Sequence, residues 1–345
     1  MKSLIVLLVA LPLSANVYAA TQTKIDSDMK KVLDALSAKK PMAIENLSAD
    51  EARKQPTTSD AVKDVLTKEN GSFIPTPIAK VEDRQIDGAA GKITARIYTP
   101  EGPTPMPVIV YYHGGGFVLA TNDTYDASPR ALANGAKAIV VSVEYRKAPE
   151  HKFPAAHDDA FAAYKWVLAN AKSFNGDPNL VAVAGESAGG NLALNVAIRA
   201  RDEKIMLPIH EVLIYPLAGT NMNTESYRVN ADAKPLNKAM MGWFMKNYTK
   251  TSAETMDVRL NLLSANLRGL NPATIITAQI DPLMTEGQKL ADRLKAQGVL
   301  VEYKNYQGVT HEFFGMAPVV SEAKDAQGFV SKGLMMSFKK QAQEE

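Results

Sequence analysis

Residues 180–191 read Leu-Val-Ala-Val-Ala-Gly-Glu-Ser-Ala-Gly-Gly-Asn, and small helix-favouring residues continue to position 197. The apolar run 180–184 predicts a buried strand, and the G-x-S-x-G pattern at 185–189 predicts a sharp turn from that strand into a helix. Glycine is needed on both sides of Ser187 because strand and helix approach too closely there for side chains. This is the setting of a nucleophilic serine, but a glycine-rich turn with an incidental serine remains the alternative at this point.

The rest of the chain alternates between apolar runs and helical stretches. The expected strands are 108–112, 138–143, 180–184, 211–215, 273–280 and 299–303. The expected helices between and after them are 127–134, 154–170, 190–197, 286–297 and 321–340. This alternation predicts an α/β fold class, with a mostly parallel central sheet and helices on both faces. Residues 81–86 and 93–98 precede it as an expected hairpin.

Two regions are surplus to the alternation. Residues 26–39 and 59–68 are predicted to be helical, and residues 221–250 are polar at first and then helical at 238–248. Loops at the carboxyl ends of parallel strands meet at one edge of the sheet, where sites form. The surplus segments are therefore the natural material for a lid over that edge.

Composition limits the classes of protein. The 345 residues suit one large α/β domain, and 39 Lys and Arg nearly balance 37 Asp and Glu. No basic run suggests a nucleic-acid partner. The chain has no cysteine, which excludes disulfides, thiol catalysis and cysteine-ligated zinc.

The first 19 residues read as a signal peptide. Lys2 precedes an apolar run at 4–13, and small residues at Val17 and Ala19 favour cleavage after Ala19. An uncleaved membrane anchor is the alternative, but the run is shorter than the roughly 20 residues that a span needs. We expect an exported protein, periplasmic or secreted, with no membrane span after signal removal.

The expected base is His311. Five histidines are present, and only His311 follows a late strand in the chain order serine, acid, histidine that a strand–turn–helix serine enzyme uses. A capping or core histidine is the alternative. His151, His157 and His210 are expected to be structural or exposed.

The acid should leave a strand between Ser187 and His311. Asp281 directly follows the strand 273–280, although Asp281-Pro282 is also a common way to begin a turn. The competitors are less well placed: Glu286 and Asp292 fall within the next helix, and Asp257 precedes the strand.

Residues 113–117, His-Gly-Gly-Gly-Phe, end the strand 108–112. Consecutive glycines let backbone N–H groups turn toward a tetrahedral oxyanion, and the N–H of Ala188 would add a donor. A flexible turn or a phosphate-binding loop is the alternative, but the sequence lacks the Lys-Ser/Thr of a P-loop and the G-x-G-x-x-G pattern.

Together these residues resemble the hormone-sensitive-lipase-like esterases, a branch of the α/β-hydrolases. The resemblance runs from about position 108 to 314 and rests on several motifs in the same order. They are 113–117 (HGGGF), 144–151 (EYRKAPEH), 153–156 (FPAA), 185–191 (GESAGGN), 281–283 (DPL) and 311–313 (HEF).

The resemblance implies a Ser187–Asp281–His311 triad with an oxyanion hole in the loop that contains Gly114, most directly Gly115 and Gly116, together with Ala188. Supporting roles follow from it for His113, which would brace this loop, for Tyr145 and Arg146 beneath the site, and for Glu186. It also implies a single α/β-hydrolase domain at 20–345, with a cap built from about 20–75 and 219–252. Three residues depart from the family pattern: Lys147, Thr285 and Glu312 stand where leucine, an acidic residue and glycine are usual.

The expected function is that of a serine carboxylesterase acting on short-chain acyl esters through an acyl-enzyme. Its partners are a small-molecule ester and water, with no metal or cofactor, and a homodimer stays open. The alternatives are hydrolysis of a lactone, an amide or an acetylated sugar, or a non-catalytic small-molecule binder on the same fold.

Overall fold

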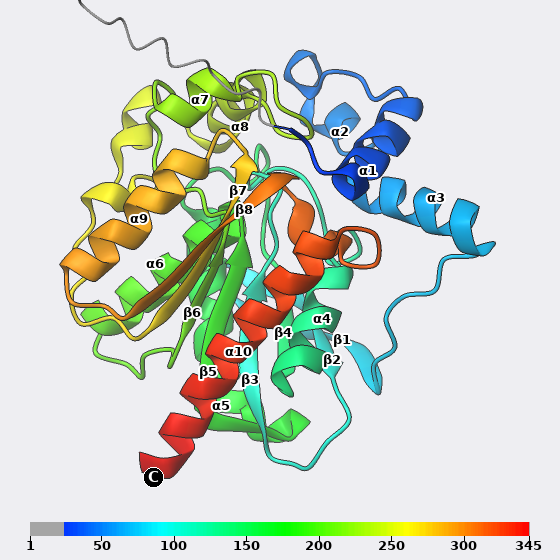
Figure 1. Ribbon diagram of the computed structural model, residues 1–345. Coiled ribbons are helices and arrows are strands. Elements are labelled where there is room, and N and C mark those ends of the chain that lie inside the picture. The colour runs from blue at the N-terminus through cyan, green and yellow to red at the C-terminus, as the bar shows by residue number, and fades with distance from the viewer. Residues whose placement is uncertain (1–23, 345) are drawn as a thin grey trace, which may run out of the picture.

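A single eight-stranded sheet forms the centre of the molecule (Figure 1), and the computed structural model describes residues 24–344. Its order is β1-β2-β4-β3-β5-β6-β7-β8. Strand β2 pairs antiparallel with β1 and β4, and every other pairing is parallel, which confirms the mostly parallel sheet. The strands are β1 (Lys80–Gly88), β2 (Gly91–Thr99), β3 (Met106–Tyr112), β4 (Ile139–Glu144), β5 (Gly176–Glu186), β6 (Glu211–Ile214), β7 (Ala273–Ile280) and β8 (Val301–Thr310).

The expected end of the last strand was wrong. Strand β8 continues to Thr310 instead of stopping at Tyr303. It is the outermost strand, so one of its edges faces away from the sheet and polar residues such as Lys304 and Asn305 are accommodated. The longer strand ends immediately before His311.

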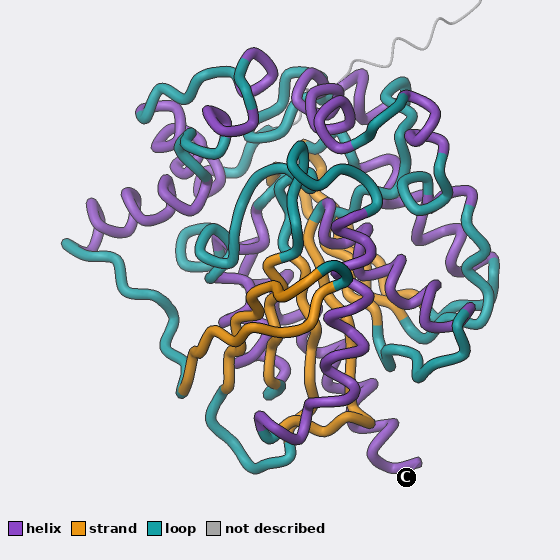
Figure 2. Tube along the Cα trace, turned by 180° about the vertical axis from the view of Figure 1, so that it is seen from behind, coloured by secondary structure: helices purple, strands orange, loops and turns teal. Residues whose placement is uncertain are grey.

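Helices cover both faces of the sheet and enclose a hydrophobic core on each side. Helices α4 (Ala127–Ala136) and α10 (Ser321–Glu344) pack on the face toward the viewer in Figure 1. Helices α5 (Ala155–Asn170), α6 (Ala188–Asp202) and α9 (Met284–Ala296) pack on the other face, and Figure 2 views the molecule from behind.

The surplus segments gather at the end of the sheet where β7 and β8 finish (Figure 1). They form α1 (Ser27–Ala38), α2 (Ala49–Ala52), α3 (Thr58–Asn70), α7 (Glu225–Val229) and α8 (Lys238–Tyr248). Short 3₁₀ helices are η1 (Ile44–Asn46), η2 (Ala171–Phe174), η3 (Ser252–Met256), η4 (Leu262–Ser264) and η5 (Phe313–Met316). The helical positions expected for α1, α3 and α8 are confirmed, whereas α2 and α7 are too short to show a helical period.

Local sequence sets the ends of the first helices. Asp26 caps α1 by accepting the N–H of Asp28 at 2.7 Å, and its own N–H donates to the carbonyl of Gly308 at 2.8 Å. A capping box between Thr57 and Asp60 starts α3. The first of these caps attaches the amino-terminal segment to the end of β8.

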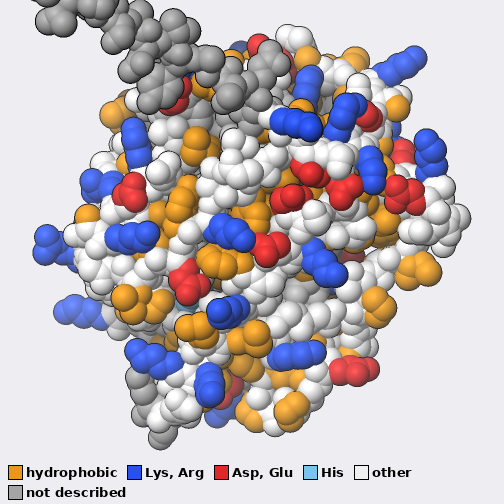
Figure 3. Space-filling model, viewed as in Figure 1, with side chains coloured by type: hydrophobic (Ala, Val, Ile, Leu, Met, Phe, Trp, Pro, Cys, Tyr) orange, Lys and Arg blue, Asp and Glu red, His pale blue; other side chains and the backbone are white. Residues whose placement is uncertain are grey.

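The signal peptide expected at 1–19 lies outside the described residues. Between residues 24 and 344 no helix combines the length and apolar character that a bilayer span requires. On the face seen in Figure 3, Lys and Arg side chains are interspersed with Asp and Glu, as the near-zero net charge predicts.

Candidate active site

Ser187 occupies the sharp turn that the sequence predicts between β5 and α6. Its backbone has φ 55° and ψ −117°, a strained conformation for a residue with a side chain. A Cβ on Gly185 would lie 2.1 Å from the carbonyl oxygen of Gly189, and a Cβ on Gly189 would lie 1.9 Å from that of Tyr112. Both positions therefore exclude every residue except glycine, and the serine is fixed at the tip.

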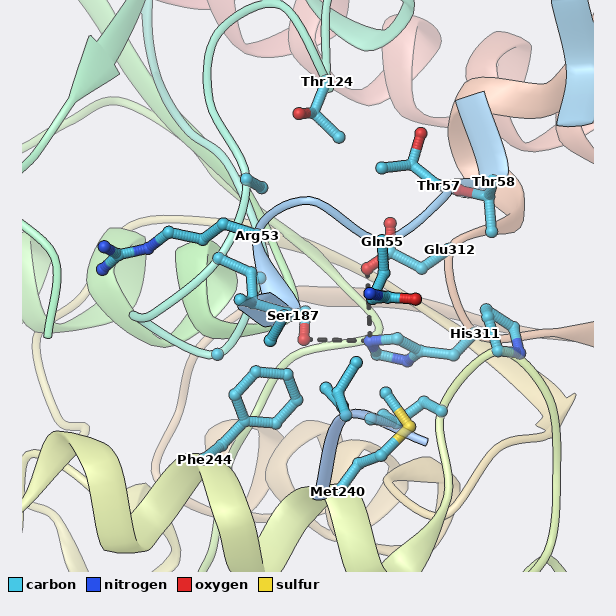
Figure 4. A pocket seen from close by; sticks show the side chains of 18 of the residues that line it. Arg53, Gln55, Thr57, Thr58, Thr124, Ser187, Met240, Phe244, His311 and Glu312 are labelled. Atoms are coloured by element: carbon cyan, nitrogen blue, oxygen red, sulfur yellow. Dashed lines mark hydrogen bonds and ion pairs between the residues drawn. The ribbon is translucent and has the colours of Figure 1, made fainter. Parts of the chain in front are cut away.

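Ser187, His311 and Asp281 are joined by two hydrogen bonds. The Nε2 atom of His311 lies 2.9 Å from Ser187 Oγ, and Nδ1 lies 2.6 Å from Asp281 Oδ2. Figure 4 shows the first of these contacts within the cavity. All three side chains are buried, and Asp281 Oδ1 also accepts the N–H of Leu283 at 2.8 Å. The structure thus places the three predicted residues in the order serine, imidazole, carboxylate.

The surroundings of His311 favour its protonated form. Burial alone would lower the pKa of this imidazole, but the charge and hydrogen bond of Asp281, with further contributions from Glu312 and Glu186, raise it above the ordinary value of 6.5. Such an imidazole is a stronger base toward the serine hydroxyl.

The glycine loop after β3 lies beside the serine. Gly115 (φ +91°) and Gly116 (φ +61°) have left-handed backbone that favours glycine, and both line the same cavity as Ser187 and Ala188. Gly114 lies outside that lining, where a Cβ would come within 2.2 Å of the Tyr125 hydroxyl. Of the three glycines, Gly115 and Gly116 therefore border the cavity and Gly114 does not, while the oxyanion hole stays a prediction.

Tyr145 and His113 have contacts that support the glycine loop, whereas Arg146 binds a residue outside it. The Tyr145 hydroxyl reaches the carbonyl oxygens of His113 at 2.8 Å and Gly114 at 3.1 Å, and its ring stacks on His113 with centroids 4.4 Å apart. Burial lowers the pKa of His113, so its ring stays neutral. Arg146 binds both carboxyl oxygens of the buried Asp159 at 2.7 and 2.9 Å.

Glu186, the residue before the serine, is buried between two tyrosines. Its carboxyl accepts a hydrogen bond from Tyr111 at 2.5 Å and one from Tyr215, whose ring lies 4.6 Å from that of His311. Burial raises the pKa of Glu186 to about 7. The side chain therefore supports the floor of the site.

The competing acids have other partners. Glu286 is buried and accepts the N–H groups of Ala218 at 2.9 Å and Gly219 at 3.2 Å, while Asp257 pairs with Arg259 at 2.8 Å. Asp292 is exposed on α9. None of these three is hydrogen bonded to His311, so Asp281 alone occupies the acid position.

The other histidines expected to be structural or exposed have partners other than Ser187. His157 is buried between Tyr248 and Asn191 at 2.8 and 2.9 Å, and His210 is buried between Ser337 and Thr274. His151 is exposed.

A cavity of about 500 Å³ opens over Ser187 and His311. Its base is the glycine loop and Ala188, and its walls come from two cap segments, residues 36–58 and 234–245. The walls are largely apolar, with Leu36, Ile44, Met240, Met241, Phe244 and Met245 among them. Charged residues also line this cavity, among them Glu45, Arg53, Lys147, Lys234 and Glu312.

The sequence did not predict the contacts of three residues at this site, namely Tyr125, Lys147 and Arg53. Tyr125 donates to both carboxyl oxygens of Glu312 at 2.6 and 2.7 Å, and Lys147 binds Glu144 and the carbonyl of Ala120, each at 2.6 Å. Arg53 reaches from the cap to Glu150 at 2.7 Å. Lys147 and Glu312 stand out in the sequence as departures from the family pattern. Tyr125 is 187 positions from Glu312 and Ala120 is 27 positions from Lys147, so only the pair of Lys147 with Glu144, three positions apart, left a signal in the sequence.

The third departure, Thr285, joins the site to the cap. Its side-chain oxygen accepts the N–H of Ser226 on α7 at 3.1 Å, and its own N–H donates to the Ser226 hydroxyl at 3.1 Å. A neutral hydrogen-bonding residue thus connects α9 to α7 at this position.

Residues 109–315, more than half of the chain, match a protein family that is described as having the α/β-hydrolase fold. The chain belongs to this family. Within it the chain joins the hormone-sensitive-lipase-like esterases, and its relatives identify it as a carboxylic ester hydrolase.

Two curated relatives and one solved structure illustrate the relationship. Carboxylesterase NlhH of Mycobacterium tuberculosis is 40% identical over 259 residues, which cover 73% of this chain and 81% of the relative. Ethyl acetate hydrolase of Pseudomonas putida is 31% identical over 303 residues, covering 86% and 93%. An esterase of Pyrobaculum calidifontis superposes with a TM-score of 0.81 at 36% identity, covering 90% of this chain and 98% of that one.

Proposed function

We propose that this α/β-hydrolase is an exported serine carboxylesterase that hydrolyses short-chain acyl esters through a Ser187–His311–Asp281 triad. The observation that carries the proposal is the imidazole of His311, which is hydrogen bonded on one side to Ser187 and on the other to Asp281. A hydroxyl is a weak nucleophile at neutral pH, and an adjacent oriented base is what activates it.

The mechanism follows from the contacts. His311 Nε2 takes the proton of Ser187 as Oγ attacks the ester carbonyl, and Asp281 stabilises the imidazolium that forms. The backbone N–H groups of Gly115, Gly116 and Ala188 receive the developing oxyanion. His311 then gives its proton to the departing alcohol. A water molecule, with His311 again as the base, hydrolyses the acyl-enzyme.

The preference for short acyl chains is supported by the cavity. The ring of Phe244 covers Gly116, since a Cβ there would come within 2.2 Å of a ring atom. This ring limits the apolar space next to the serine. The ethyl acetate hydrolase of Pseudomonas putida, named for a small ester, supports the same substrate class.

Replacing the serine tests the proposal. Ser187→Ala is expected to lower kcat for p-nitrophenyl butyrate by about 10⁶-fold, because the nucleophile of a triad acts as a unit with its base. A fluorophosphonate probe should label the wild-type protein and leave the variant unlabelled. Hydrolysis that persists in the purified variant at the wild-type rate would refute the triad.

Export is proposed from the sequence pattern alone. Cleavage after Ala19 would leave every described residue, including Asp26 and its bond to Gly308, in the mature protein. Amino-terminal sequencing of protein recovered from the periplasm or the medium should begin at Ala20. Recovery only of the full-length chain from the cytoplasm would contradict this proposal.

A further inference from the structure

Glu312 places a second carboxylate beside the reacting nitrogen of His311. Its Oε1 lies 3.9 Å from Nε2, the atom that faces Ser187, and Figure 4 marks this pair with a dashed line. The backbone of Glu312 has φ +70°, in the left-handed region that glycine adopts without strain. A glutamate persists there only because its surroundings hold it, and strain of this kind is concentrated at functional sites.

Tyr125 holds this carboxylate in place. The tyrosine is buried, and its hydroxyl lies 2.6 and 2.7 Å from the two oxygens of Glu312. The same hydroxyl packs against Gly114, where a Cβ would come within 2.2 Å of it. Glu312 is therefore positioned relative to both the base and the glycine loop. Its side chain is 22% exposed and lines the cavity above Ser187.

The spacing between the two groups suits a water molecule. A separation of 3.9 Å is too long for a direct hydrogen bond. Two polar atoms at this distance can share one water, which donates one hydrogen to Nε2 and the other to the carboxylate. A water molecule between these two groups would contact His311 Nε2, the atom that exchanges protons with Ser187.

We propose that Glu312 positions the water molecule that hydrolyses the acyl-enzyme. This inference rests on the proposed triad. One water proton passes to His311 Nε2 while the water oxygen bonds to the acyl carbon. The tetrahedral species then breaks its bond to Ser187 Oγ, and the proton on Nε2 passes to Oγ as the carboxylic acid leaves. Glu312 accepts a hydrogen bond from the second water proton throughout and ends unchanged.

The geometry also predicts a choice between acceptors. Water has two O–H groups and can satisfy His311 and Glu312 together, whereas an alcohol has one and can satisfy His311 only. Glu312 should therefore favour hydrolysis over transfer of the acyl group to an alcohol. A residue that only stabilised the fold would not change this ratio.

The test is the partition of the acyl-enzyme between water and methanol. Wild type, Glu312→Ala and Glu312→Gln react with p-nitrophenyl butyrate at several methanol concentrations, and butyric acid and methyl butyrate are quantified. In Glu312→Ala the ratio of acid to methyl ester should fall about tenfold, the change expected when one charge-assisted hydrogen bond is lost. Glu312→Gln retains an oxygen acceptor and should fall between the two.

Glu45→Ala is the matched control, because Glu45 lines the same cavity from the amino-terminal cap segment. Its ratio should equal that of wild type. The ratio is measured on active molecules only, so a reduced folded fraction does not affect it. An unchanged ratio in Glu312→Ala overturns the inference. A ratio of butyric acid to methyl butyrate that differs in wild type between p-nitrophenyl and phenyl butyrate would overturn the acyl-enzyme itself, because a common intermediate must partition identically whatever its leaving group was.

Discussion

The imidazole of His311 lies among three carboxyl groups on three segments. Asp281 follows β7, Glu312 follows β8, and Glu186 ends β5. Burial opposes a charge on the ring, but the carboxylates outweigh it and raise the pKa of His311. The balance of these effects sets the pH range in which the base is available.

The acid limb of kcat/KM should therefore lie above pH 6.5. His311 must be neutral to accept the serine proton, so activity falls as pH drops through its raised pKa. Asp281→Asn removes the largest favourable charge; it should move the limb to lower pH and lower kcat by about 10⁴-fold. Rate profiles between pH 5 and 9 check both effects, and a limb at or below 6.5 in wild type would contradict the first.

The sequence predicted the reacting residues because chain order and strand ends constrain them. Few serines lie in a turn between a strand and a helix, and few histidines follow a late strand, so these two requirements select Ser187 and His311. Tyr125 could not be predicted, because it is 187 positions from Glu312 and only the folded chain brings them together.

Among the elements, the second cap segment controls the space above the serine. Helix α8 presents Phe244 to Gly116, and the side chain is 5% exposed. The neighbouring Trp243 lies outside the cavity lining, where its indole N–H donates to the carbonyl of Leu47 at 3.0 Å. Two adjacent aromatic residues thus have different roles.

Phe244→Ala should shift the enzyme toward longer acyl chains. Removing the ring opens apolar volume next to Gly116, and we expect kcat/KM for octanoate relative to butyrate to rise about tenfold. The cavity left behind should lower the free energy of unfolding by about 3–5 kcal/mol. Kinetics on p-nitrophenyl esters test the shift, with Trp243→Phe expected to keep the wild-type profile.

The first cap segment is attached to the body of the enzyme by Arg53. Its guanidinium donates to the carbonyls of Val118 at 3.0 Å and Ala148 at 2.8 Å, and to Glu150 at 2.7 and 2.8 Å. Val118 follows the glycine loop, so this arginine joins the cap to the segment that carries the expected oxyanion donors.

Arg53→Ala should loosen this segment selectively. Loss of hydrogen bonds that involve a charged group is expected to cost about 1.5–3 kcal/mol, so amide exchange in residues 36–58 should accelerate by tenfold or more while the sheet stays protected. Arg84→Ala, which removes an arginine bound to Glu82 on β1, is the control. Equal exchange in the two variants would show that Arg53 does not anchor the cap.

Element positions followed from apolar periodicity where elements are long, as in α8 and β7. The pattern failed at β8, whose exposed edge carries polar residues, and at α7, which has five residues. Contacts such as that between Arg53 and Val118 leave no local signal, because charged residues at the surface and at an interface look alike in sequence.

Taken as a whole, the molecule buries several carboxyl groups without a cation. Glu211 begins β6 fully buried, and neither of its carboxyl oxygens has a hydrogen-bond partner among the described residues. Burial raises its pKa well above the ordinary value, and it raises the pKa of Glu286 to about 8 and that of Glu186 to about 7. Folding of the chain is therefore more favourable when these carboxyl groups are protonated.

The stability that these three carboxyl groups contribute should therefore fall as pH rises from about 5 to 9. The unfolded chain releases these protons near pH 4.3, whereas the folded chain retains them until pH 7 or above, so unfolding becomes more favourable across this window. Glu211→Gln should raise Tm at pH 8 and reduce the slope of Tm against pH. Glu302→Gln, at an exposed position of β8, should change neither. A steeper slope in Glu211→Gln would refute this explanation.

The hydrogen bond between the amino-terminal segment and β8 has a consequence for biosynthesis. Asp26 is hydrogen bonded to Gly308, and Thr310 contacts Met29, a residue 281 positions away. During synthesis, the turn that carries Ser187 is made long before β8 and His311. The nascent protein would thus remain inactive, with the start of α1 not yet docked, until β8 and His311 have been made. Esterase activity should consequently appear only after β8 has been made and has joined the sheet.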